Sequence, residues 1–284
     1  MNLVVDLGNY NTKTNKNVIF KSAFIRGKDI NPMGEDIVFV DNEYYTIGKG
    51  TFDNKFNKAL KNYKPNLCCA IAKSIDEKEC SINLMLGVPL DNLGIIDLFK
   101  EQLLGKDLEF TFNNEDYKIH INDLKAVGEG VSSFYTFNTT QRAEDLLIID
   151  IGGRTTNVAS FEKGKLIKKF TIPLGMLDLF SRIGTKYNNL NGDNKIPEEI
   201  ERLIDSKYIT DVEDEEKQFL DDIMNYIESK LDRRTYKNYY TGGGSERLKV
   251  HIENYLQPNG IIMENPLFTN VKGNEVIAKT IWGD

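Results

Sequence analysis

Short apolar runs alternate with amphipathic stretches along the chain, a pattern that indicates interleaved strands and helices. Two hairpins are expected over 36–47 and 108–121, turning at Asp41-Asn42 and Asn113-Asn114. Further strands are expected over 18–24, 80–88, 124–127, 157–162, 166–173 and 236–241. Helices are expected from Glu129 and Pro197 onward and over 55–74, 91–104, 175–187, 213–231 and 245–256. The pattern as a whole predicts an α/β fold.

The start of the chain is echoed half a chain later. Residues 3–12 read LVVDLGNYNT, and residues 147–156 read LIIDIGGRTT. In each copy three aliphatic residues precede an aspartate (Asp6 or Asp150), and a glycine and a threonine follow at the same spacing. Each copy then continues with the turn and strand pattern of a β-meander. We therefore expect two similar α/β domains.

The repeated motif suits the binding of phosphate and Mg²⁺. Glycine lets the backbone approach an anion closely, and the N–H groups of such a turn converge on an anion site. Carboxylates are hard oxygen ligands for Mg²⁺, which uses one or two of them and keeps several waters. For one copy alone, a buried aspartate that only holds the turn explains the pattern equally well. The duplication with identical spacing favours a site that grips a phosphate chain and its metal with two turns.

A third element with glycines is Gly242-Gly243-Gly244, between an expected strand and an expected helix. Three glycines let the backbone lie against the flat face of a ligand, and a helix N-terminus favours negative charge. The element matches neither the P-loop pattern nor the GxGxxG pattern. By itself it is a weak signal for nucleotide binding.

The composition excludes several other classes of protein. A length of 284 residues predicts two domains, and the net charge of −7 disfavours direct DNA binding. Three cysteines without CxxC spacing argue against a disulfide framework and a zinc site and fit a reducing cytoplasm, and only two histidines exclude a multi-histidine metal centre. The N-terminus has no basic leader region and the apolar runs are far shorter than a membrane span, so we expect a cytoplasmic protein without membrane contact.

The order of the motifs resembles that of the actin-like ATPase superfamily. A first phosphate motif at 6–13, a linker glutamate at Glu129, a second phosphate motif at 150–156 and an adenosine motif at 241–246 follow one another. Within this superfamily the chain resembles the ParM-like bacterial actins, which form filaments for plasmid segregation. The segment 266–273 (PLFTNVKG) is similar to their C-terminal segment.

The resemblance implies two duplicated RNase H-like (actin-type) domains with a nucleotide cleft between them. The first domain is expected over 1–138, with an inserted small subdomain at about 26–90. The second is expected over 139–284, with a reduced subdomain at about 187–235 that resembles the compact AlfA-type members. The C-terminal segment, about 271–284, is expected to pack back on the first domain.

The resemblance also assigns roles to residues. Glu129 is expected to orient the attacking water, Asp150 to act in catalysis, and Asp6 and Asp150 to orient Mg²⁺ through water. Asn157 stands where the family often has Asp and receives no metal role. For Lys13 a solvated strand lysine, and for Glu129 an ordinary acidic residue at a helix start, stay open as alternatives. The expected nucleotide-binding residues are Asp6, Gly8, Asn9, Tyr10, Asn11, Lys13, Gly152, Gly153, Arg154, Thr155, Gly242, Gly243 and Gly244.

The function that the resemblance implies is that of an ATPase, with GTP also compatible, that polymerises into a filament and hydrolyses nucleotide within it. It would move plasmid DNA through a DNA-binding, ParR-like adaptor without touching DNA itself, in agreement with the acidic charge. Two alternatives stay open: a small-molecule kinase of the type III pantothenate kinase kind, which opens with a similar motif, and a monomeric nucleotide-switch ATPase. The Glu129 linker and the 266–273 segment favour the filament over the kinase.

Overall fold

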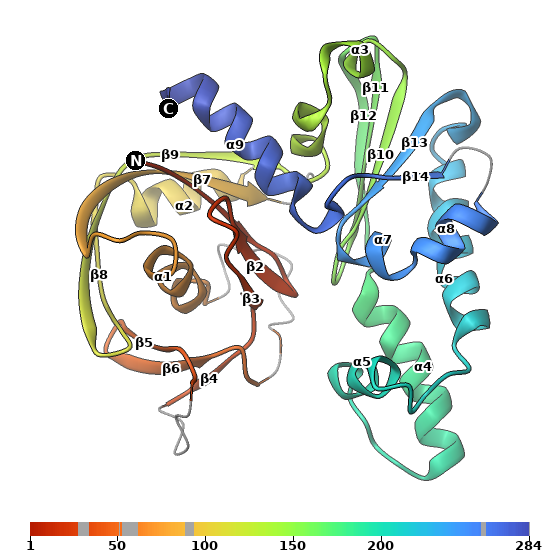
Figure 1. Cartoon of the computed structure of the whole chain (residues 1–284), viewed down its shortest axis with the longest axis horizontal. Coiled ribbons are helices and arrows are strands. Elements are labelled where there is room, and N and C mark those ends of the chain that lie inside the picture. The colour runs from red at the N-terminus through yellow and green to blue at the C-terminus, as the bar shows by residue number, and fades with distance from the viewer. Residues whose placement is uncertain (28–33, 51, 53–61, 89–93, 257–259, 284) are drawn as a thin grey trace. The chain divides into compact units, whose positions relative to one another are not determined.

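The computed structural model (Figure 1) describes residues 1–27, 34–50, 52, 62–88, 94–256 and 260–283. The chain divides into two compact units. Unit 1 comprises Met1–Asn138 and Phe268–Asp284, and unit 2 comprises Thr139–Leu267. The residues after unit 2 therefore return to the unit that contains the N-terminus. None of the helices in the described part of the chain is both long and apolar enough to cross a membrane.

Unit 1 is built on one large sheet. Its strands are β1 (Asn2–Leu7), β2 (Asn11–Thr14), β3 (Ile19–Lys21), β4 (Phe24–Arg26), β5 (Ile37–Val40), β6 (Glu43–Ile47), β7 (Glu79–Val88), β8 (Asp107–Phe112) and β9 (Glu115–Gly128). Among the described residues they lie in the order β3-β2-β1-β7-β9-β8-β5-β6-β4. The helices are α1 (Lys64–Ala72), α2 (Ile95–Leu103), the 3₁₀ helix η1 (Ser132–Thr136) and α9 (Thr269–Trp282).

Unit 2 is built on a smaller sheet. Its strands are β10 (Leu146–Ile151), β11 (Thr156–Glu162), β12 (Lys165–Ile172), β13 (Lys237–Thr241) and β14 (Gly260–Ile262). They lie in the order β12-β11-β10-β13-β14. The helices are α3 (Thr139–Arg142), α4 (Met176–Asn191), α5 (Pro197–Asp205), α6 (Glu213–Glu228), α7 (Gly243–Arg247) and α8 (Lys249–Tyr255), with 3₁₀ helices η2 (Arg233–Thr235) and η3 (Pro266–Phe268).

The two sheets share a five-strand core, which is β3-β2-β1-β7-β9 in unit 1 and β12-β11-β10-β13-β14 in unit 2. In each core the first three strands of the unit form an antiparallel meander. The last two strands of each core run parallel to β1 or to β10. The repeat in the sequence is therefore a repeat in topology, and the predicted duplicated α/β fold is confirmed. The extra strands of unit 1 extend its sheet, which curls around α1 (Figure 1).

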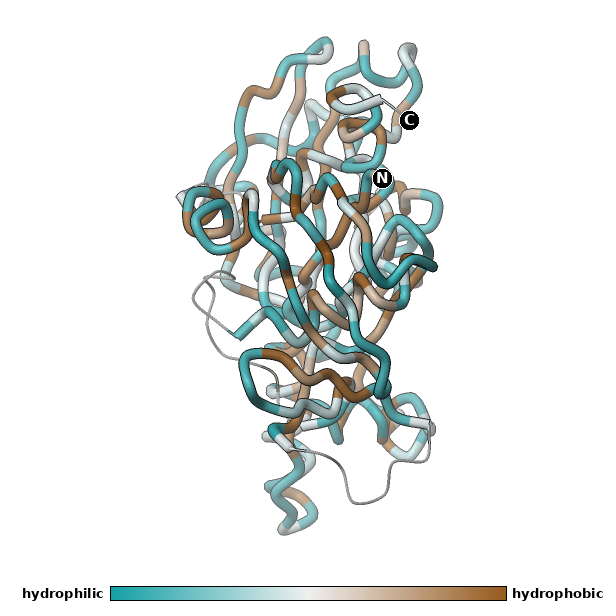
Figure 2. The backbone as a smooth tube through the Cα atoms, turned by 90° about the vertical axis from the view of Figure 1, so that its left-hand side faces the viewer, coloured by the Kyte–Doolittle hydropathy of each residue, from teal (hydrophilic) through white to brown (hydrophobic). Residues whose placement is uncertain are grey.

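The two faces of the unit 1 sheet pack against different helices. Leu3 and Val5 of β1 belong to a buried core with α1. Val4 points to the opposite face, where Val271 of α9 packs against it. Figure 2 shows hydrophobic positions interspersed with hydrophilic ones along the chain, as strand alternation requires. By the same alternation, Asp6 lies on the face of the sheet that α9 covers.

Both expected hairpins form, as β5–β6 and β8–β9. Their turn residues have left-handed backbone angles, with φ of 50° and 63° at Asp41 and Asn42 and of 50° and 67° at Asn113 and Asn114. Such angles match the primed turns that suit the twist of a hairpin. The helix expected over 55–74 is present as α1, with Pro65 in its first turn. Residues 55–61 of that expected helix lie outside the described residues.

Some element boundaries differ from expectation. The helix expected to begin at Glu129 is wrong, because β9 ends at Gly128 and a turn follows before η1. Glycines flank Glu129, and Gly130 has a φ of 77°, which a helix does not allow. The helix expected over 245–256 is two short helices, α7 and α8, and the strand expected over 18–24 is divided between β3 and β4.

Candidate functional site

In unit 1 the first phosphate motif forms the turn from β1 to β2. Asp6 is paired across the sheet with Lys13, and the carboxylate Oδ2 lies 3.5 Å from the ammonium Nζ. Only 5% of the Asp6 side chain and 12% of the Lys13 side chain are exposed, so Lys13 is not a solvated strand lysine. Gly8 must be glycine, because a Cβ there would collide with the carbonyl oxygen of Asn11. The turn is therefore tightly closed beside a buried ion pair.

Ser22 hydrogen bonds two carbonyl oxygens of this turn, both on the same side of the turn. The hydroxyl of Ser22 donates to the Gly8 carbonyl over 2.6 Å, and the Ser22 N–H donates to the Tyr10 carbonyl over 2.8 Å. In a trans peptide the C=O and the N–H of the next residue point in opposite directions. The N–H groups of Asn9 and Asn11 are therefore directed away from Ser22. Convergent backbone N–H groups of this kind form anion sites.

In unit 2 the second phosphate motif forms the corresponding turn from β10 to β11. The N–H of Gly152 donates to the Thr155 carbonyl over 2.9 Å, and a Cβ at Gly152 would lie 3.0 Å from that oxygen. The first two N–H groups of α4 donate to the carbonyls of Gly152 and Gly153 over 3.0 and 2.9 Å. The N–H groups of Gly153 and Arg154 therefore point away from α4. In both turns, N–H groups therefore lie on the side opposite to the anchored carbonyls.

The glycine triplet packs against the end of β10. Asp150 is buried, with 5% of its surface exposed. Gly242 has a φ of 84°, and a Cβ there would collide with the Asp150 carboxylate. A Cβ at Gly244 would collide with the side chain of Ile151. The triplet and Asp150 are therefore one packed element within unit 2.

Gly243→Val is expected to fold like wild type and to weaken nucleotide binding at least tenfold. The atom nearest to a Cβ at position 243 is Cδ1 of Leu267, at 3.3 Å, so the side chain has room in the fold, whereas the nucleotide is expected against this backbone. In contrast, Gly244→Val forces Ile151 to move and is expected to cost about 1–3 kcal/mol of stability. Thermal melting and calorimetric titration with ATP and GTP measure both effects. Nucleotide binding by Gly243→Val at wild-type affinity would show that this loop does not contact the nucleotide.

Glu129 is half-buried in the turn after β9. Its N–H donates to the Val88 carbonyl, at the end of β7, over 2.8 Å. β1, β7 and β9 are neighbouring parallel strands. Asp6, Gly87 and Glu129 therefore lie at the carboxyl ends of three adjacent strands, where α/β sheets usually bind ligands. The structure brings these residues to one edge of unit 1.

Each unit has one buried aspartate at the start of its turn, and a carboxylate of this kind is a hard oxygen donor that suits hydrated Mg²⁺. Asp6 belongs to unit 1 and Asp150 to unit 2. In the part of the chain that the structure describes, no group of three or more His, Cys, Asp or Glu side chains could hold a metal ion. Mg²⁺ keeps several of its waters and uses one or two carboxylates, so it does not need such a group.

Sequence reasoning missed Asn274, which lies on α9 and is fully buried. A Cβ placed on Gly87 would be 3.7 Å from the Asn274 Nδ2 and 3.3 Å from the Asp6 Oδ1. Asn274 follows directly after the 266–273 segment, but an asparagine beyond a motif carries no signal of its own. Only the return of α9 to unit 1 brings it close to Asp6.

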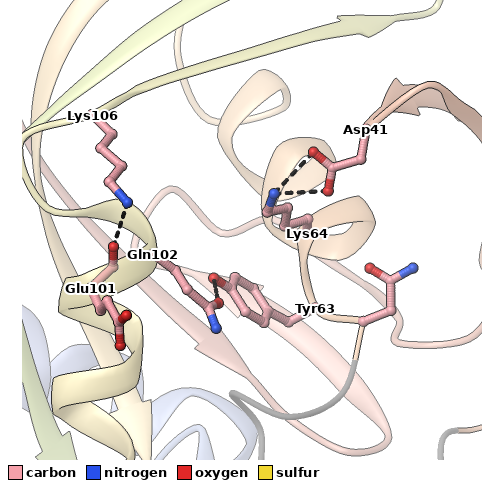
Figure 3. A pocket seen from close by; sticks show the side chains of 7 residues that line it. Asp41, Tyr63, Lys64, Glu101, Gln102 and Lys106 are labelled. Carbon is pink, nitrogen blue, oxygen red and sulfur yellow. Dashed lines mark hydrogen bonds and ion pairs between the residues drawn. The ribbon is translucent and has the colours of Figure 1, made fainter.

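A pocket of about 580 Å³ lies apart from these motifs, between the β5–β6 turn, α1 and α2 of unit 1 (Figure 3). Its polar groups pair with one another. The ammonium of Lys64 lies 2.9 and 2.8 Å from the two carboxylate oxygens of Asp41, and the hydroxyl of Tyr63 donates to Gln102 over 2.6 Å. The pocket is lined by Asp41, Asn62, Tyr63, Lys64, Glu101, Gln102 and Lys106, none of which belongs to the expected nucleotide-binding set.

Two units with the same strand order, each with an aspartate before a glycine-containing turn, define the two-domain fold of actin-like proteins. Residues 5–131 match the family model described as the actin like proteins N terminal domain. This part of the chain is therefore similar in sequence to the N-terminal domain of actin-like proteins. Among curated proteins, none matches the sequence.

Solved structures have the same fold over nearly the whole chain. The archaeal actin homologue Ta0583 in complex with ADP has a TM-score of 0.83 at 19% identity, covering 99% of both chains. A 15-stranded ParM filament from Clostridium botulinum has a TM-score of 0.79 at 19% identity, covering 98% of this chain and 99% of that chain. The AlfA filament from a B. subtilis plasmid has a TM-score of 0.66 at 17% identity, covering 96% and 97%. The predicted resemblance to ParM-like bacterial actins is thus confirmed for the fold.

Proposed function

We propose that this chain is a Mg²⁺-dependent nucleoside triphosphatase of the actin type that assembles into filaments. The observation that carries the proposal is the pair of matched turns. Each has a buried aspartate at its start, anchored carbonyl oxygens, and N–H groups on the opposite side. One such turn is common in proteins, whereas two with the same spacing and topology suit the several charges of a triphosphate.

The residues present fit both parts of Mg-nucleotide. Backbone N–H groups of the two turns and the ammonium of Lys13 offer donors to phosphate oxygens. Asp6 and Asp150 offer carboxylate oxygens to hydrated Mg²⁺, which when bound would neutralise charge on the phosphates. Glu129 holds the attacking water in line, because positioning dominates the catalysis of phosphoryl transfer. The backbone of the glycine triplet contacts the adenosine part of the nucleotide.

Assembly into filaments is supported by the fold. ParM from Clostridium botulinum and AlfA from B. subtilis, both with this fold, were solved as filaments. The net charge of −7 suits a filament that meets plasmid DNA through a basic, ParR-like adaptor, because an acidic surface repels DNA directly. The proposed role is therefore DNA segregation by a filament with an adaptor.

The purified protein is expected to assemble when Mg²⁺ and a nucleoside triphosphate are added together, and not with either alone. Assembly is expected to follow nucleotide binding, and hydrolysis is expected to follow assembly. Light scattering, pelleting and electron microscopy with ATP, GTP and non-hydrolysable analogues measure this, with phosphate release in parallel. Monodisperse particles under every nucleotide and magnesium condition would refute the filament. Phosphate transfer to pantothenate instead of water would favour the kinase.

A further inference from the structure

One face of α9 reaches two parts of the candidate site. Asn270 and Asn274 are four positions apart, so their side chains lie on the same side of the helix. The Asn270 Oδ1 accepts hydrogen bonds from the Gly130 N–H (2.9 Å), the Ser132 hydroxyl (3.0 Å) and the Ser133 hydroxyl (2.8 Å). The segment immediately after Glu129 is therefore fastened to α9.

Further contacts hold α9 along its length. Gly273 lies so close to η1 that a Cβ there would collide with the Ser132 carbonyl oxygen. At the far end, the indole N–H of Trp282 donates to the Asp123 carboxylate over 2.9 Å. Burial raises the pKa of Asp123, but hydrogen bonds from Trp282 and the Leu124 amide, together with Lys125, outweigh burial and leave this pKa below its ordinary value. The helix is thus a fixed part of unit 1.

Asn274 differs from the other polar residues of this face. Its side chain is fully buried, yet within the described residues neither its Oδ1 nor its Nδ2 has a hydrogen-bond partner. A buried amide without partners costs free energy, so such groups usually serve a ligand or an ordered water. The amide and the Asp6 carboxylate both border the point above Gly87 where another residue would carry its Cβ.

We propose that Asn274 is a positioning residue of the magnesium site, and that through it Mg-nucleotide binding is coupled to α9. The inference rests on the proposed function. An asparagine amide both donates and accepts, so it can hydrogen bond a water that Mg²⁺ retains and a carboxylate that orients the metal. Groups that hold the ligands of a metal tune its affinity even without touching the metal.

The deciding variant is Asn274→Leu, because leucine has the same branching at Cγ and no polar atoms. In wild type, ADP or GDP is expected to bind more tightly with Mg²⁺ than with EDTA. In Asn274→Leu this magnesium-dependent gain is expected to fall at least tenfold, while binding in EDTA and the melting temperature without nucleotide are unchanged or raised. Isothermal titration and thermal melting provide these readouts. Asn274→Ser, which keeps a hydroxyl, is expected to retain part of the gain.

The matched control is Thr280→Ala, at an exposed position on the same helix, which is expected to behave as wild type. Trp282 is the only tryptophan of the chain, so its fluorescence reports on α9 directly. Mg-ADP or Mg-GDP is expected to change this fluorescence in wild type but not in Asn274→Leu. If the variant melts lower and keeps the full magnesium gain, Asn274 is structural and the inference is wrong. Absence of nucleotide binding by wild type would instead overturn the proposed function.

Discussion

Glu129→Ala is expected to release phosphate at least ~10²-fold more slowly than wild type, a barrier change of about 2.7 kcal/mol, while it still binds nucleotide and assembles. In the proposed role the side chain would act on the attacking water and not on the phosphates, so ground-state binding is expected not to depend on it. The fold is expected to tolerate the change, because the Glu129 N–H donates to the Val88 carbonyl and Asn270 accepts from the Gly130 N–H, and both bonds remain in the variant. Phosphate release and scattering in one cuvette measure both properties.

The matched control for this variant is Glu115→Ala, because Glu115 starts the same strand, β9, and makes an exposed ion pair with Lys78. Its loss is expected to change neither hydrolysis nor assembly, since exposed ion pairs contribute little. Filaments of Glu129→Ala are expected to outlast those of wild type, because their nucleotide stays unhydrolysed. Hydrolysis at the wild-type rate would show that Glu129 is an ordinary acidic turn residue with no role in hydrolysis. Loss of assembly together with hydrolysis would give it a structural role.

Asp150→Ala is expected to lower the affinity for Mg-nucleotide about 100-fold, or about 2.7 kcal/mol, and to affect folding much less. In the proposed site the substitution would remove a hard oxygen donor for hydrated Mg²⁺ and would leave the triphosphate charge less well neutralised. Asp150→Asn keeps the shape beside Gly242 and is expected to show the same loss of affinity. Calorimetry with and without Mg²⁺, and thermal melting, separate binding from stability.

The matched control lies directly across the sheet. Asn157 pairs with Asp150 in the register of β10 and β11, and its Oδ1 accepts a hydrogen bond from the Thr171 hydroxyl over 2.9 Å. Asn157→Ala is expected to lower stability by about 1 kcal/mol through loss of this bond and to leave magnesium dependence intact. Equal effects of Asp150→Ala and Asn157→Ala on nucleotide affinity would assign Asp150 a structural role.

The duplicated part of the fold could be predicted from local patterns along the chain. An aliphatic strand that ends in Asp-x-Gly is a short-range signal, and both copies, Asp6 and Asp150, form the expected strand and turn. The hairpin turns at Asp41-Asn42 and Asn113-Asn114 are equally local, because asparagine and aspartate tolerate a positive φ. In such cases a few neighbouring residues determine the backbone, and the sequence is sufficient.

Features that depend on distant contacts could not be predicted in this way. The three glycines at 242–244 look equivalent in sequence, yet Gly242 and Gly244 are packed against β10 and Gly243 is not. The need for glycine at these two positions comes from Ile151 and Asp150, almost a hundred positions earlier in the sequence. Asn274 is a stronger case, because its role follows from the return of α9 to β1 and β7. The spacing of residues within α9 does not predict that Asn274 lies close to Asp6.

The position of α9 in the sequence has a consequence for how the chain folds during synthesis. The ribosome makes all of unit 2 before α9, so Val4 and its face of the unit 1 sheet wait uncovered for a time on the order of ten seconds. Until then, Asn270 cannot fasten the segment that follows Glu129. The nascent protein therefore cannot complete the edge of the unit 1 sheet that holds Asp6 and Glu129 before its second unit has been made.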